Sequence, residues 1–228
     1  MKRFWTDVAV EADGGIKLDA RPVRTPGRTP LILPTAALAE AVAAEWRAVE
    51  GDIDPRAMPL TGLANAAIDR IGPDPARFAD DLARYAASDL LCYRAEAPTE
   101  LVARQALAWD PPLDWARTRY DVHFAITRGI MHVDQPTATV TRLSDAVRAL
   151  GAFDLAALSP VVTITGSLVL ALALIEQAMP SDAIWATAHV DEDWQTERWG
   201  EDALAARSLA AKRAEYDGAV RFLAALRV

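Results

Sequence analysis

One short stretch of the sequence collects most of the side chains that could bind a ligand. Residues 191–202 read DEDWQTERWGED, in which six carboxylates stand against one arginine. His189 precedes this run and lies four residues before Asp193 and eight before Glu197. On a helix this spacing places all three side chains on one face, where they could supply nitrogen and oxygen ligands to a metal. The same spacing is also typical of a solvated acidic face.

Two tryptophans interrupt the acidic run, at Trp194 and Trp199. If residues 181–199 form one helix, Trp199 shares a side with Trp185 and Glu192, whereas Trp194 lies on the opposite side. A helix buries one side in its own bundle. The second aromatic side therefore indicates either a central helix with neighbours all round or a surface for a partner that carries apolar groups and arginines. Both alternatives remain open at this point.

Other common catalytic patterns are absent from the sequence. No glycine-rich phosphate loop, no GxSxG and no HExxH occurs. The only cysteine, Cys92, lies in the apolar context LLCY, which favours a small buried residue over a thiolate nucleophile. A binding protein without catalytic activity and without a cofactor is therefore expected, and a metal-dependent enzyme using His189, Asp193 and Glu197 is the alternative.

Composition narrows the possible partners and the compartment. The net charge is −8 and the isoelectric point is near 4.9, with three lysines and 21 arginines. Nucleic acid and anionic membrane surfaces are unfavourable partners for such a chain. A single cysteine fits a reducing compartment, and the N-terminal segment has Asp7 and Glu11 where an export signal would be apolar. These features predict a bacterial cytoplasmic protein.

The segment from Leu155 to Ile175 contains no charged residue. It is long enough to cross a bilayer, so a membrane-associated protein is a third hypothesis. However, the segment contains several hydroxyl-bearing residues, a proline and a glycine, and it lacks basic flanks. We expect no membrane insertion but a buried core helix that begins with Ser159 as its N-cap and Pro160 as its first residue.

The pattern of apolar residues predicts an α+β, mainly helical chain with two domains. In the N-terminal domain, residues 1–72, short extended pieces flank the turn signal Asp13-Gly14-Gly15 and predict a small antiparallel sheet. Helices are expected from Thr35 to Gly51 and over 60–71. Residues 73–228 should form a helical bundle domain, with a hairpin over 122–133 and a helix break at Asp110-Pro111-Pro112. The expected helices of this domain cover 75–89, 98–109, 111–119, 137–149, 160–178, 181–199 and 203–227.

The chain resembles a known protein family over nearly its whole length. The stretches that carry the resemblance are RFW at 3–5, LDARPVRTP at 18–26, LPTAALAEAVAAEW at 33–46, MPLTGLANAAID at 58–69, SDLLCYRAEAPTELVARQALAWDPPLDW at 88–115, GSLVLALAL at 166–174 and DEDWQTERWGED at 191–202. These are similar to the assembly chaperones of F-type ATP synthase, which capture the α subunit before it joins the catalytic ring. A second proline at position 112 departs from the family's pattern.

The resemblance implies a small β-containing domain joined to a helical domain, and no enzymatic activity. It also implies that the ATP synthase α subunit is the partner and that the chaperone keeps this subunit from aggregating. The family's acidic segment is similar to residues 191–202, so the resemblance implies Glu192, Asp193, Glu201 and Asp202 as candidate partner-binding residues. Trp194 and Trp199 are added as the aromatic side chains of the same run, since tryptophan is typical of interfaces. Because Gly200 can end a helix, Glu201 and Asp202 are also candidates for capping the next one.

Overall fold

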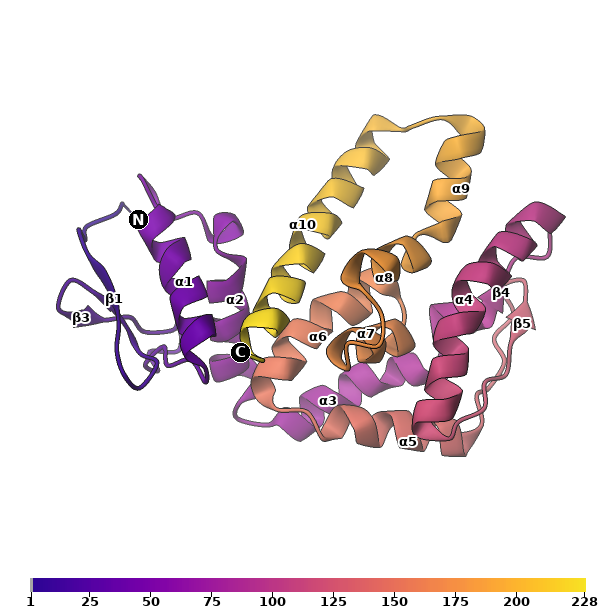
Figure 1. Cartoon of the computed structure of the whole chain (residues 1–228), viewed down its shortest axis with the longest axis horizontal. Coiled ribbons are helices and arrows are strands. Elements are labelled where there is room, and N and C mark those ends of the chain that lie inside the picture. Colours follow the sequence, from indigo (N-terminus) through magenta and orange to yellow (C-terminus); the bar gives the residue numbers. More distant parts are fainter. Residues whose placement is uncertain (1) are drawn as a thin grey trace. The chain divides into compact units, whose positions relative to one another are not determined.

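The computed structural model describes residues 2–228 (Figure 1). The chain forms two compact units, and the described residues are mainly helical with two small sheets. Unit 1 contains residues up to Pro75 together with Gly151–Ala157 and Ala214–Val228, and unit 2 contains Ala76–Leu150 and Leu158–Arg213. The expected α+β, mainly helical class is confirmed. The expected division between residues 72 and 73 stays a prediction.

A three-stranded antiparallel sheet opens unit 1. Strands β1 (Val8–Val10), β2 (Ile16–Leu18) and β3 (Arg21–Pro22) follow each other in the sheet as in the sequence. The turn between β1 and β2 contains Gly14 at φ +83°, and a Cβ at this position would lie 2.2 Å from the carbonyl oxygen of Leu33. Only glycine fits both the backbone angle and the space. The predicted hairpin is therefore present.

Two helices complete the first part of unit 1. Helix α1 (Ala36–Ala48) begins where Thr35 accepts a hydrogen bond from the Leu38 N–H, as the sequence predicts. After a 3₁₀ turn, η1 (Pro55–Ala57), helix α2 (Pro59–Ala66) runs into a π-helical turn, η2 (Ala67–Ile71). The Glu45 carboxylate on α1 accepts 2.8 Å bonds from the N–H groups of Leu60 and Thr61. These bonds satisfy orphan donors at the start of α2.

Unit 2 begins with short elements. Helix α3 (Pro75–Ala83) passes into the 3₁₀ turn η3 (Arg84–Ala87), and a second turn, η4 (Leu90–Cys92), leads into β4 (Tyr93–Arg94). The expected hairpin over 122–133 is wrong, because β5 (Thr127–Arg128) pairs in parallel with β4. A partner strand 34 residues earlier in the sequence cannot be recognised from a local turn signal.

Helix α4 (Thr99–Tyr120) runs without interruption through Pro111 and Pro112, so the expected break is wrong. Asp110 does not cap a restarted helix, since its carboxylate accepts a 2.7 Å bond from Arg94 instead. Each interior proline opposes a helix by about 3 kcal/mol. The fully buried face formed by Trp109, Leu113 and other residues of α4 offsets this cost, because burying such side chains contributes about 1.5–3 kcal/mol each.

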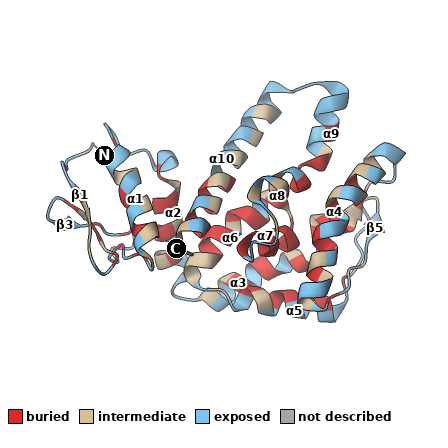
Figure 2. Ribbon diagram, viewed as in Figure 1, coloured by how far each residue is buried: buried red, intermediate tan, exposed pale blue. Residues whose placement is uncertain are grey.

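The uncharged segment forms two helices where one was expected. After α5 (Thr137–Arg148), helix α6 (Ala152–Thr165) ends before Gly166, and α7 (Leu168–Ile175) begins with Ser167 as its N-cap. The predicted N-cap at Ser159 is wrong, since α6 starts seven residues earlier. Every residue of α7 is buried (Figure 2), as expected for a core helix. Among the described residues, no helix is long and apolar enough to cross a membrane.

The expected helix over 181–199 is also divided. Helix α8 (Ser181–Ala188) and helix α9 (Val190–Trp199) meet at His189. Helix α10 (Ala203–Ala225) follows after a short turn. Within unit 2, α4 packs against both α7 and α9, and α7 packs against α8. The predicted alignment of Trp185 with Trp199 along one continuous helix is therefore wrong, whereas Trp194 and Trp199 do lie on different sides of α9, one buried and one exposed.

Candidate partner-binding surface

Helix α9 is attached to α4 by two carboxylates of the acidic run. Glu197 forms two hydrogen bonds with the guanidinium of Arg104, at 2.6 and 2.9 Å. Six residues earlier on α9, Asp191 accepts a 2.7 Å bond from the side chain of Gln105. The Arg104 bond lowers the pKa of Glu197, so this carboxyl group stays ionised. Asp191 and Glu197 therefore hold α9 in place rather than offering free charge.

The part of α10 that belongs to unit 2 is attached to α8. Arg213 donates a 2.5 Å bond to the Asp182 carboxylate, and its guanidinium lies 5.1 Å from the ring centre of Trp185. The Trp185 ring in turn stacks on His189. This contact holds α10 at its middle, while residues 203–212 are exposed or half-buried along their whole length.

A tight turn joins α9 to α10. Gly200 ends α9 with φ +85° and ψ 173°, a combination that is essentially restricted to glycine. Asp202 caps α10, because its Oδ1 atom accepts bonds from the N–H groups of Leu204 and Ala205 at 2.9 and 2.8 Å. Of the two capping candidates, Asp202 therefore caps the helix. The carboxyl group of Glu201 makes no hydrogen bond or ion pair within the described part of the chain.

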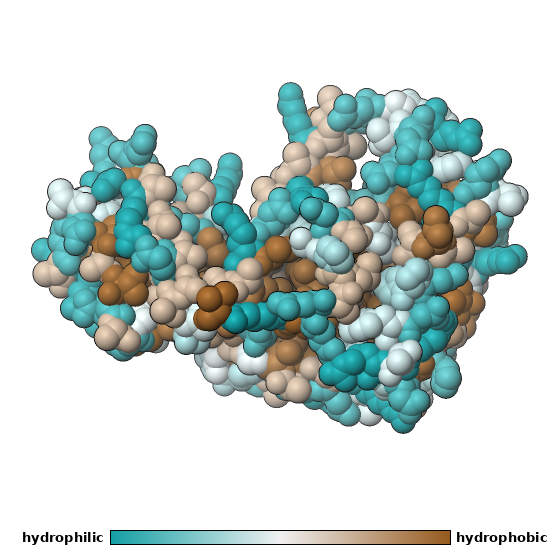
Figure 3. All heavy atoms as spheres, in the orientation of Figure 1, coloured by the Kyte–Doolittle hydropathy of each residue, from teal (hydrophilic) through white to brown (hydrophobic). Residues whose placement is uncertain are grey.

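A groove of about 310 Å³ lies between α9 and α10. Its floor on α10 includes Ala205, Ala206 and Leu209, and Lys212 contributes the single positive charge of the lining. Figure 3 shows mainly hydrophilic atoms over α9, a mixture of near-neutral and hydrophilic atoms over the end turn, and weakly apolar atoms over the first half of α10. The lining also contains Thr196, Ser208 and all four predicted carboxylates, Glu192, Asp193, Glu201 and Asp202. The groove thus combines an apolar floor with a rim of charged side chains.

The two predicted tryptophans lie in different environments, and neither lines the groove. Trp194 is buried, with the Arg198 guanidinium 4.5 Å from its ring centre. Trp199 is 78% exposed at the end of α9, and Leu204 at the start of α10 is 76% exposed. The end turn therefore presents two large apolar side chains beside the acidic groove, whereas Trp194 packs inside unit 2.

Sequence reasoning did not identify the α10 side of the groove. Ala205, Leu209 and Lys212 recur at spacings of four and three, which places them on one face of a helix. That spacing could have indicated the α10 side of the groove, because it sets two apolar residues and a lysine on one helix face directly after the acidic run. Arg104 and Gln105 were also missed. They lie more than 80 residues from their partners on α9, and no local pattern links them.

The alternative metal site does not form. His189 lies at the junction of α8 and α9, where its Nδ1 atom is 2.8 Å from the Trp185 carbonyl oxygen, and Glu197 is bonded to Arg104. Within residues 2–228, no group of three or more His, Cys, Asp or Glu side chains is arranged to hold a metal ion. Burial raises the pKa of the Cys92 thiol to about 12, so this cysteine stays protonated and unreactive.

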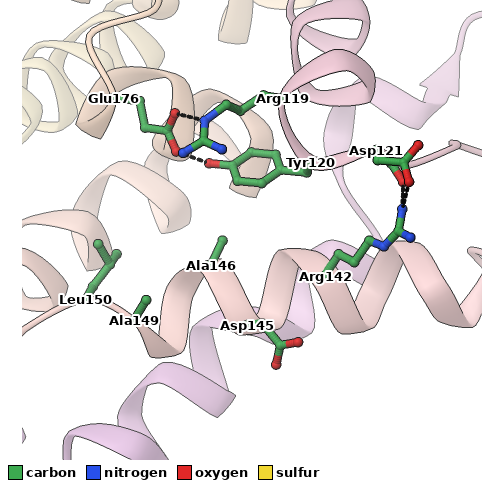
Figure 4. A pocket seen from close by; sticks show the side chains of 9 residues that line it. All are labelled: Arg119, Tyr120, Asp121, Arg142, Asp145, Ala146, Ala149, Leu150 and Glu176. Atoms are coloured by element: carbon green, nitrogen blue, oxygen red, sulfur yellow. Dashed lines mark hydrogen bonds and ion pairs between the residues drawn. The ribbon is translucent and has the colours of Figure 1, made fainter.

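A second, wider hollow of about 690 Å³ lies at the end of α4 and along α5. Figure 4 shows that its two arginines point at carboxylates of the chain itself. Arg119 and Tyr120 both donate to Glu176, and Arg142 donates to Asp121. Because each cation already has an anionic partner, this hollow offers less unbalanced charge to a ligand than the groove between α9 and α10.

The comparisons with known proteins agree with the resemblance found in the sequence. The profile of the family described as ATP12 chaperone protein matches residues 2–117, which is half of the chain. A curated relative, the mitochondrial protein atp12 of Schizosaccharomyces pombe, is 26% identical over 214 residues, which cover 87% of this chain and 74% of the relative.

Solved structures extend the likeness through the acidic run. Atp12 from Paracoccus denitrificans, and a point mutant of it, are each 43% identical with a TM-score of 0.93, covering 99% of this chain and 98% of theirs. A proposed chaperone from Agrobacterium tumefaciens is 41% identical with the same TM-score, covering 99% of this chain and 86% of its own. The expected family of ATP synthase assembly chaperones is thereby confirmed, and the chain belongs to the ATP12 chaperone protein family.

Proposed function

We propose that this protein holds the free α subunit of F-type ATP synthase, prevents its aggregation and delivers it to the catalytic ring without catalysing a reaction. The observation that carries this proposal is the convergence of Glu192, Asp193, Glu201 and Asp202 on one groove with an apolar floor. Membership in a chaperone family supports a holding role. We propose the bacterial cytoplasm as the compartment. The bacterial part of this proposal is supported by two similar solved structures, which come from Paracoccus denitrificans and Agrobacterium tumefaciens.

The chemistry of the surface suits reversible capture. An unassembled subunit exposes apolar surface that later faces its neighbours, and a chaperone must cover this surface without forming a permanent complex. Trp199 and Leu204 offer exposed apolar area at the end turn. The carboxylates beside them can pair with arginines or lysines of the partner, which contributes specificity and a fast encounter more than raw affinity.

The six carboxylates of the run differ in how available they are. Asp191 and Glu197 are bonded to α4, and Asp202 uses one oxygen to cap α10. Within residues 2–228, the carboxyl groups of Glu192, Asp193 and Glu201 make no hydrogen bond or ion pair. These three are therefore the strongest candidates for contact with the partner, and Asp202 follows them.

The direct test measures aggregation of isolated α subunit by light scattering in the presence of this protein. Wild-type protein should suppress the scattering in a stoichiometric manner. The variants Glu192→Lys and Glu201→Lys should reduce the suppression several-fold, because each places a positive charge where the partner's cations would lie. The matched control is Glu215→Lys on the same helix α10, which lies outside the groove and should behave as wild type.

Two results would count against the proposal. If wild-type protein leaves the aggregation of the α subunit unchanged, the assigned partner is wrong. If all four charge reversals, at Glu192, Asp193, Glu201 and Asp202, suppress aggregation as well as wild type while remaining folded by circular dichroism, the binding surface lies elsewhere.

A further inference from the structure

We infer that the groove between α9 and α10 receives an amphipathic helix of the partner, which carries an apolar stripe and a flank of arginine or lysine. This inference rests on the proposed function and specifies what kind of segment the site recognises. Four features of the described residues support it: the small side chains of the floor, the charge of the rim, the absence of a strand edge and the length of the walls.

The floor of the groove allows a close approach. Ala205 and Ala206 have the smallest side chains that a helix can present besides glycine, and Leu209 adds one larger apolar group. Packed helices approach to 8–10 Å between axes, and the side chains at the contact set the distance. An alanine-rich floor therefore suits the ridge of a second helix, which would bury the apolar area of α10 that is now exposed.

The charge of the rim selects the partner's polar side. The lining has four carboxylates, from Glu192, Asp193, Glu201 and Asp202, against the one cation of Lys212. An incoming helix with arginines or lysines beside its apolar stripe would satisfy this imbalance. An acidic helix would meet like charges, which cost free energy when they are placed together on binding.

The walls of the groove exclude strand addition. Recognition of an extended segment by β-augmentation requires a sheet edge with free backbone groups. Both walls here are α-helices, whose interior N–H and C=O groups bond within the helix. A partner segment therefore gains no backbone hydrogen bonds from these walls, and a helix has the advantage that it satisfies its own backbone groups.

The walls also have a suitable length. Helix α9 has ten residues, and the first half of α10 is of similar length. The residues that line the groove run from Glu192 to Thr196 on α9 and from Ala205 to Lys212 on α10. At a rise of 1.5 Å per residue the two walls therefore extend for about 6 Å and about 10 Å, which corresponds to about one to two turns of a partner helix. The contacts to α4 and α8 described above hold both walls in position, so the groove exists before the partner arrives.

The test uses synthetic peptides and the full-length protein. The probe is an 18-residue peptide of leucine, lysine and alanine, with leucines spaced i, i+3, i+4 and i+7. One comparison peptide has the same composition in an order that spreads the leucines over all faces, and another replaces every lysine by glutamate. Titration calorimetry and amide chemical shifts should reveal one site, with binding at least ten-fold weaker for both comparison peptides.

Two variants locate the site. Ala205→Arg adds a long side chain and a positive charge to the exposed floor of the groove, and it should weaken binding of the probe at least ten-fold. Ala211→Arg is the matched control, because this exposed position lies about 120° around α10 from Ala205 and does not line the groove. Both sites are exposed helix positions that accept arginine readily, and thermal unfolding would verify that both variants fold.

Several outcomes would overturn the inference. Equal binding of the spread-leucine peptide would remove the amphipathic requirement, and unchanged binding to the Ala205→Arg variant would remove the groove. A groove occupied by a second copy of this chain would appear as a dimer in sedimentation that the probe cannot dissociate. If the Ala205→Arg variant still protects the α subunit while Glu201→Lys does not, the proposed function stands and the helix inference fails.

Discussion

The indole N–H of Trp109 donates a 2.8 Å hydrogen bond to the carbonyl oxygen of Thr187. In a continuous helix this carbonyl would accept a bond from the N–H four residues later, whereas here it lies at the end of α8. Trp109 is fully buried on α4. The bond therefore joins α4 to the point where α8 gives way to α9, and it satisfies an acceptor that the break leaves open.

The first prediction concerns this bond. The Trp109→Phe variant should lower the free energy of unfolding by about 1–3 kcal/mol, because it leaves a buried carbonyl without its donor. Urea denaturation measures the change. Hydrogen exchange should also become faster at residues 186–192, around the junction of α8 and α9.

Trp115→Phe is the matched control for the loss of ring volume on the same helix. Trp115 is half-buried and contacts Tyr120 edge to face. If both variants lose the same stability and exchange alike at 186–192, the hydrogen bond to Thr187 has no special role in the junction.

The second prediction concerns the ion pair between Arg104 and Glu197. Reversing one charge, as in Arg104→Glu, should reduce protection of the α subunit several-fold, since α9 loses its attachment to α4. Global stability should change little, because exposed ion pairs contribute little. The exchanged pair Arg104→Glu with Glu197→Arg should restore much of the protection, as measured by light scattering. A double variant no better than the single one would indicate that the pair does not position α9.

The third prediction concerns Asp89, which is fully buried and accepts bonds from the N–H groups of Val169 and Leu91. Burial raises its pKa from 3.8 to about 6, although these bonds act in the opposite direction. The folded chain therefore binds more protons than the unfolded chain between about pH 4 and 6. The stability that the Asp89 carboxyl group contributes is therefore present below about pH 4 and is lost as the pH rises through about 6.

The Asp89→Asn variant removes this titration. The unfolding free energy of wild type minus that of the variant should fall by about 2–3 kcal/mol between pH 4 and pH 7, because the pKa shift of about two units corresponds to 1.36 kcal/mol per unit and the unfolded carboxyl group is already partly ionised at pH 4. Urea denaturation at several pH values gives this difference directly. A difference that stays constant with pH would mean that Asp89 does not titrate with a raised pKa.

The fourth prediction concerns the first hairpin of unit 1. The Gly14→Ala variant should cost more than about 2 kcal/mol, because its Cβ would meet the Leu33 carbonyl oxygen at a positive φ. Gly51→Ala is the control, since no atom lies within 4 Å of a Cβ at that position. Thermal unfolding followed by circular dichroism compares the two. Equal loss for both variants would contradict the crowding at Gly14.

Local sequence patterns predicted most of the individual elements. The start of α1 at Thr35, the turn around Gly14 and the buried core segment that contains α7 each depend on residues that are close together in the chain, so their chemistry is visible in a short window. The pairing of β4 with β5 and the continuity of α4 through two prolines depend on burial against distant segments. Such contacts outweigh local preference, and no short window contains them.

The candidate site also depends partly on local sequence and partly on contacts between distant segments. The sequence by itself determined the composition of the acidic run and placed six carboxylates next to two tryptophans. Only the tertiary structure decided which of these groups are available. It bonds Glu197 to Arg104, buries Trp194, uses Asp202 as a cap and directs Glu192 and Glu201 into a groove whose other wall begins at residue 203. The physical reason is that composition sets which charges exist, whereas packing between segments far apart in the chain decides which of them are neutralised and which remain exposed to a partner.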